Sequence, residues 1–152
     1  MVDALLFGSI GVIAETSEIQ RLAYNQSFDE HGFDWYWSIA NYCELLKSPG
    51  GKKRIIDFAN AKLSDDIIDS IHERKERIFF EKLKAGLSPR EGIVECINVC
   101  RKKGIKIGLI TTTSQNNIDA LEQALSNTIS FKHFDLITTK ADVKKAKPSG
   151  EV

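Results

Sequence analysis

IKIGLITTTS, at residues 105–114, joins a dense apolar run to four hydroxyl side chains. A short apolar run of this kind predicts a buried β-strand, here Ile105–Ile110. Ser114 is a favourable N-cap residue and predicts a helix from Gln115 to about Ser126. The stretch therefore predicts a strand that leads directly into a helix, which is the repeating unit of parallel α/β sheets.

Two further apolar runs predict strands near the two ends of the chain, at Ala4–Phe7 and at residues 134–138 (FDLIT). A helix is expected over residues 88–103, because Ser-Pro-Arg-Glu opens it with an N-cap, a first-turn proline and a capping-box glutamate. Helices that connect apolar strands imply parallel pairing of those strands. The sequence therefore predicts a parallel sheet with helices packed on it.

The middle of the chain lacks strand-like runs and has helical periodicity instead. Helices are expected at residues 17–30, 35–47, 52–63 and 65–85. The predicted fold class is therefore α/β, with a sheet core formed by residues 1–14 and 88–152 and an inserted helical lobe of residues 15–87.

Composition restricts the class of protein. The 152 residues include 21 Lys+Arg and 21 Asp+Glu, and this zero net charge argues against a nucleic-acid-binding protein. No apolar run reaches the roughly 18–20 residues of a membrane span, so no membrane partner is expected. Cys96 and Cys100 are expected to pack in the core rather than bind metal. Few cysteines and the lack of a secretory signal at residues 1–7 predict a cytoplasmic protein.

Thr111 is the first candidate ligand-binding residue, because open α/β sheets bind ligands beyond the carboxyl ends of their strands. Its hydroxyl and the backbone N–H groups of Thr112 and Thr113 can hold a phosphate, and capping of the next helix explains these residues equally well. Lys147 can neutralise a phosphate or a carboxylate, although a solvated lysine-rich tail is its simpler explanation. The first strand ends differently, since residues 8–11 (GSIG) include no carboxylate, lysine or histidine.

The helical lobe contains a second group of candidates. Gly51 and Lys52, together with Arg54, could place positive charge at a helix start that faces an anionic ligand, or simply lie on the exposed surface. The aromatic residues 35–37 (WYW) are expected in the core of the lobe, with a substrate groove as the alternative.

Three segments together resemble the haloacid dehalogenase superfamily, in the branch of β-phosphoglucomutase, phosphoglycolate phosphatase and the Calvin-cycle sugar-bisphosphate phosphatases. VDALLFGSIGVIAETSEIQRLAYNQSFDEHGFDW (residues 2–35) is similar to the first motif and first cap helix, IGLITTTS (107–114) to the second motif, and VKKAKPSGE (143–151) to the third. The resemblance implies a Rossmann-like core with an α-helical cap, activity on small sugar phosphates, and Mg²⁺ as cofactor.

The resemblance also assigns individual residues. It implies that Thr111 and Lys147 contact a phosphate and that the GGK turn belongs to the cap. The family ends its first strand in Asp-x-Asp-Gly-Thr, where the first Asp is the nucleophile and a metal ligand and the second is the general acid and base. Gly8 and Ile10 stand at these two positions, so no catalytic pair is intact and tight Mg²⁺ binding is not expected.

The family also has a fourth, acidic motif that does not occur before Val152, so the core is expected to be incomplete at its C-terminal end. The sequence favours a catalytically impaired homologue that binds a small phosphorylated ligand. A working hydrolase with rearranged chemistry is one alternative. The other is a non-enzymatic interaction module, in which a second copy or a partner chain covers the exposed edge of the first strand.

Overall fold

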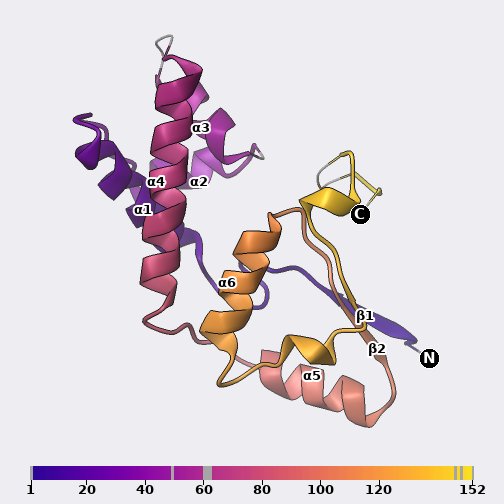
Figure 1. The fold of residues 1–152 in the computed structure, drawn as a ribbon. Helices are drawn as coiled ribbons and strands as arrows, with labels where there is room; N and C mark the ends of the chain where they lie inside the picture. Colours follow the sequence, from indigo (N-terminus) through magenta and orange to yellow (C-terminus); the bar gives the residue numbers. More distant parts are fainter. Residues whose placement is uncertain (1, 49, 60–62, 146, 148, 152) are drawn as a thin grey trace. The chain divides into compact units, whose positions relative to one another are not determined.

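The computed structural model describes residues 2–48, 50–59, 63–145, 147 and 149–151. The chain divides into two compact units (Figure 1). We call Met1–Thr16 with Leu83–Val152 the sheet unit and Ser17–Lys82 the helical unit. Among the described residues, no helix combines the length and the apolar character that a membrane crossing requires.

The sheet unit contains a parallel sheet of three strands in the order β1-β2-β3. The strands are β1 (Ala4–Phe7), β2 (Lys106–Leu109) and β3 (Leu136–Ile137). The helices of the unit are α5 (Ile93–Lys102), α6 (Gln115–Leu125) and the short 3₁₀ turns η1 (Phe131–His133) and η2 (Lys140–Asp142). The predicted α/β fold class is thus confirmed, and β1 lies at an edge of the described sheet as expected.

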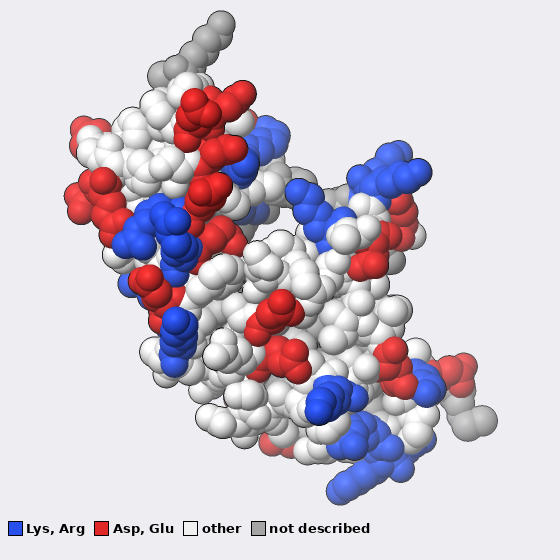
Figure 2. Space-filling view, viewed as in Figure 1, with Lys and Arg blue, Asp and Glu red and all other residues white. Residues whose placement is uncertain are grey.

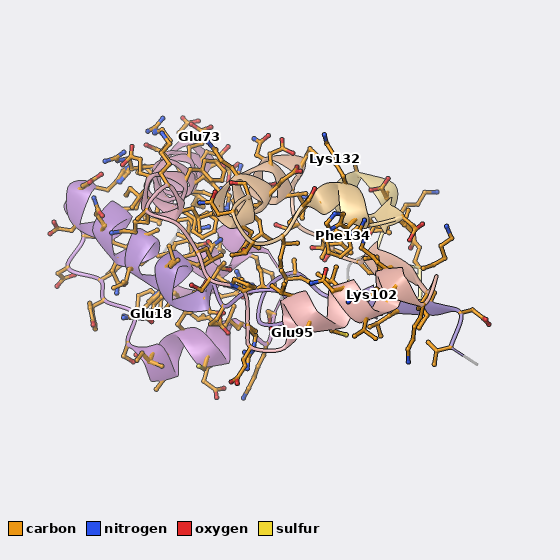
Figure 3. All side chains as sticks on the ribbon, turned by 90° about the horizontal axis from the view of Figure 1, so that it is seen from below. Glu18, Glu73, Glu95, Lys102, Lys132 and Phe134 are labelled. Atoms are coloured by element: carbon orange, nitrogen blue, oxygen red, sulfur yellow. The ribbon has the colours of Figure 1, made fainter. Side chains whose placement is uncertain are left out.

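One face of the sheet forms the core of the sheet unit. Phe7 and Leu109 are paired in register and are buried together with side chains of α5 and α6. Phe134, which is labelled in Figure 3, packs edge-to-face on Phe7, with ring centroids 6.2 Å apart. The cluster also includes Ile13, Ala14, Ile97, Cys100, Ile107, Ile118, Leu121, Leu125, Ile129 and Phe131. Burial of these apolar side chains is the main force that holds the helices on this face.

On the opposite face of the sheet, one register row has two exposed leucines on either side of the buried Gly108. Leu6 pairs with Gly108, and Gly108 pairs with Leu136. The exposed fraction is 63% for Leu6 and 54% for Leu136. Parallel sheets are usually covered on both faces, so this row is an unusual feature of the described chain.

Helix α5 begins four residues later than the sequence predicts, at Ile93 rather than at Pro89. The backbone N–H of Arg90 donates to the carbonyl of Ile13 over 2.9 Å, which ties this segment to the loop after β1. Gly92 then has a φ of 80°, a left-handed conformation that a helix interior excludes. The capping signals at residues 88–91 are therefore overridden by a long-range hydrogen bond.

The helical unit consists of α1 (Ser17–Glu30), α2 (Ile39–Leu45), α3 (Gly51–Ala59) and α4 (Asp65–Leu83). The predicted bounds of α1 and the start of α4 are confirmed. Part of the helix predicted at 52–63 falls on residues 60–62, which lie outside the described residues. On the face shown in Figure 2, acidic and basic side chains of this unit are interspersed, in keeping with the zero net charge.

The helix predicted at 35–47 is wrong in its first turn, because α2 begins only at Ile39. The backbone of Trp37 is held by α1: its N–H donates to Asn25, and its carbonyl accepts from Arg21 over 2.6 Å. Ser38 then caps the helix through a hydrogen bond from the Asn41 N–H. The aromatic residues before Ser38 therefore form an extended segment that lays Trp37 into the core.

Candidate phosphate-binding site

The site in the sheet unit is built on the loop that follows β2. The Thr111 side chain is buried, and its Oγ1 accepts hydrogen bonds from Ser9 Oγ and from the Thr113 N–H, each over 3.1 Å. Because a hydroxyl has two acceptor positions and one proton, this leaves the Thr111 proton to donate to another group. Thr111 is thus set up as a hydrogen-bond donor at the carboxyl end of the sheet.

Thr138, at the end of β3, fixes the backbone of Thr111 on both sides. Its Oγ1 accepts from the Thr111 N–H and donates to the Thr111 carbonyl, both over 3.0 Å. The sequence singled out Thr138 only as a strand end. The Thr113 amide, predicted to face a phosphate, is instead used inside the loop, and α6 begins only at Gln115.

Lys147 lies at the same end of the sheet. Its Nζ donates to the carbonyl of Ile110, the residue before Thr111, over 2.8 Å. A Cβ atom built on Gly8 would lie 3.9 Å from Lys147 Nζ and 3.1 Å from Val12 Cγ2. A side chain at position 8 would therefore start close to the ammonium group. The structure brings Gly8, Thr111 and Lys147 together, as the strand-end prediction required.

The donor set at this end of the sheet does not fit Mg²⁺. Magnesium is held by carboxylate oxygens, and Gly8 and Ile10 provide none. Of the nearby carboxylates, Glu15 lies 3.9 Å from Arg90 and Asp142 accepts from the N–H and hydroxyl of Thr139. Across the described ranges, no group of three or more His, Cys, Asp or Glu residues could hold a metal ion.

Gly51 begins α3 in the helical unit and is closely surrounded. A Cβ atom at this position would overlap His72 Nε2 and lie 2.7 Å from the Tyr24 hydroxyl oxygen. Burial raises the pKa of Tyr24 and lowers that of His72. A side chain larger than glycine therefore does not fit at the start of α3.

Lys52 and Arg54, the other two candidates of the helical unit, both have partners within it. Lys52 Nζ forms an ion pair with Asp69 over 2.6 Å, and both side chains are about half exposed. Arg54 donates to the carbonyls of Leu45 and Ser48, over 3.1 and 3.2 Å. Arg54 thus braces the turn between α2 and α3, and contact of either residue with a ligand stays a prediction.

Lys75 is a buried cation that the sequence analysis missed. Its side chain is 4% exposed, and its Nζ lies 4.8 Å from the ring centroid of Tyr24 and 2.7 Å from a carboxylate oxygen of Glu76. Burial lowers the pKa of Lys75, and Glu76 opposes this effect. Helical periodicity places Lys75 on the inner face of α4, but periodicity gives no reason to expect a charge there.

Comparison with known proteins identifies the class of protein to which this sheet topology and these strand-end residues belong. The profile of the haloacid dehalogenase-like hydrolases matches residues 10–152, and the chain belongs to this family. Protein CbbY of Cereibacter sphaeroides is 35% identical over 156 residues, which cover 100% of this chain and 68% of CbbY. The predicted family and branch are confirmed.

Solved structures show the same similarity. The crystal structure of CbbY from Rhodobacter sphaeroides in complex with phosphate has a TM-score of 0.85 at 35% identity. A CbbY mutant from the same organism in complex with xylulose-(1,5)bisphosphate has a TM-score of 0.84, also at 35% identity. Each match covers 98% of this chain and 68% of the solved one. The chain is therefore similar to both solved structures over nearly its whole length.

Proposed function

We propose that the chain binds the phosphate group of a small sugar phosphate at the carboxyl ends of β1 and β2 and does not hydrolyse it through an aspartyl-phosphate. The observation that carries this proposal is the position of Gly8. The Cβ of a side chain there would lie 3.9 Å from Lys147 Nζ, beside the Thr111 loop, and glycine supplies no such side chain. Thr111 and Lys147, which can bind a phosphate, therefore lie at a site that lacks a nucleophile at position 8.

The binding half of the proposal rests on Thr111 and Lys147. The free proton of the Thr111 hydroxyl and the ammonium of Lys147 are the two kinds of donor that a phosphate oxygen accepts most readily. The relatives in the two CbbY complexes hold phosphate and xylulose-(1,5)bisphosphate, which supports the same ligand class for this chain.

The catalytic half of the proposal follows from the residues around Gly8. Phosphoryl transfer to protein needs a nucleophile in line with the phosphorus, and a proton donor for the leaving group. Ile10 is 48% exposed and has no titratable group. Ser9 is buried and donates to Thr111, whose hydroxyl is not a base, so this hydrogen bond does not activate the Ser9 hydroxyl.

Phosphate release from a panel of sugar monophosphates and bisphosphates, with Mg²⁺ present, tests the catalytic half. The expected rate for the wild-type chain equals that of the Lys147→Ala variant and of buffer alone. Release well above both, and abolished by Lys147→Ala, would support a working hydrolase with rearranged chemistry and contradict the proposal.

An interaction module is a second candidate, and the exposed side chains of Leu6 and Leu136 favour it. Exposed apolar sheet surface is commonly covered in a complex. If this function dominates, the mass in sedimentation equilibrium should rise with concentration, and Leu6→Lys should abolish the rise. A constant monomer mass for the wild-type chain would argue against it.

A further inference from the structure

We infer that the strand-end site binds a phosphate monoester dianion without a metal ion, in contrast to the Mg²⁺ dependence that the family resemblance implies. This inference rests on the proposed function. It is carried by the disagreement between the donor set of the site and the needs of Mg²⁺, and it concerns the residues Gly8, Ile10, Thr111 and Lys147.

The described residues that directly follow the three strands carry no carboxylate. Gly8, Ser9 and Ile10 follow β1, and hydroxyl residues follow β2 and β3. The carboxylate of Glu151 accepts from the N–H groups of Lys144 and Lys145, so it is used in the loop that contains Lys147. No ion pair joins Lys147 to a carboxylate of the residues that the structure describes.

The charge balance of the site therefore differs from that of a site built on a pair of aspartates. Paired carboxylates repel a phosphate dianion, and a divalent cation between them removes that repulsion. Here Lys147 meets no carboxylate at position 8, and its Nζ is 3.9 Å from where the Cβ of such a residue would lie. Its charge is available to the ligand directly, so a cation has nothing to neutralise.

The first test is titration of the wild-type chain with inorganic phosphate by isothermal calorimetry, once in EDTA and once in excess Mg²⁺. We expect the two dissociation constants to agree within about twofold. Binding that appears only with Mg²⁺ would overturn the metal-free site and leave the proposed function standing. Absence of binding under both conditions, by protein that is folded by circular dichroism, would overturn both.

The second test compares Gly8→Asp with Gly8→Asn. Both side chains meet Val12 in the same way, since the Cβ would lie 3.1 Å from Val12 Cγ2, so their difference reports the charge alone. In EDTA we expect Gly8→Asp to bind phosphate about tenfold more weakly than Gly8→Asn, because like charges a few ångströms apart repel. We expect excess Mg²⁺ to reduce this difference.

Equal phosphate affinity of the two variants in EDTA would contradict the electrostatic argument. Thermal melting of both variants shows whether either substitution disturbs the fold. If both variants melt well below wild type, the Val12→Ala background provides the room for the new side chain, and the same comparison is made there.

Discussion

The Trp37→Ala variant is expected to lose about 3–5 kcal/mol of unfolding free energy, a large fraction of the total stability of a folded domain. Trp37 is fully buried, and its ring lies 4.5 Å from that of Tyr24 and 4.9 Å from that of Phe28. The rings of Tyr42 and Phe58 lie 5.8 and 5.6 Å away. Removal of the indole therefore opens a cavity at the centre of an aromatic cluster, which the neighbouring rings cannot fill without leaving their own contacts.

Urea denaturation followed by far-ultraviolet circular dichroism measures this effect, because α1 and α4 contribute much of the helical signal. Ile39→Ala is the matched control: Ile39 is 64% exposed at the start of α2, so its truncation should cost well under 1 kcal/mol. An equal shift of the urea midpoint in both variants would show that Trp37 is not the centre of this core.

The elements whose ends depend on neighbouring residues were predictable from the sequence. Ser114 accepts a hydrogen bond from the Asn117 N–H, so the start of α6 is encoded within four residues. The bounds of β1 and α1 are likewise confirmed. Gly104, with a φ of 67°, follows the end of α5 as predicted.

The elements that depend on distant residues were not predictable in this way. The segment before α2 has a helical apolar pattern, yet Arg21 and Asn25 hold the backbone of Trp37 extended. The same contacts explain why Arg21 is 5% exposed while the adjacent Leu22 is 41% exposed, the reverse of what hydropathy predicts. A guanidinium that satisfies a buried carbonyl can be buried itself without a large cost.

In the candidate site too, the features that depend on neighbouring residues were predictable and those that depend on distant residues were not. Thr111 and Lys147 were found because a hydroxyl after a strand and a lysine near the next strand end are local features of the sequence. The hydrogen bond from Ser9 to Thr111 joins residues 102 positions apart, and only the parallel pairing of β1 with β2 reveals it. The closeness of position 8 to Lys147 Nζ also required the fold.

The Thr111→Val variant is expected to bind inorganic phosphate at least tenfold more weakly than wild type and to lose about 1–3 kcal/mol of unfolding free energy. Valine has nearly the same shape as threonine, so the cavity term is small. The affinity falls because the hydroxyl that donates to the phosphate is gone. The stability falls because the Ser9 hydroxyl and the Thr113 amide lose their common acceptor.

Calorimetric titration and urea denaturation measure the two effects on the same samples. Thr111→Ser keeps the hydroxyl and should restore most of the phosphate affinity, which a role of Thr111 in packing alone would not predict. Thr128→Val is the control for loss of a hydroxyl elsewhere, since Thr128 is exposed after α6 and donates only to the Leu125 carbonyl. If Thr111→Val bound phosphate as tightly as wild type and Thr128→Val do, the ligand would not contact Thr111. The carboxyl ends of β1 and β2 would then not be the binding site.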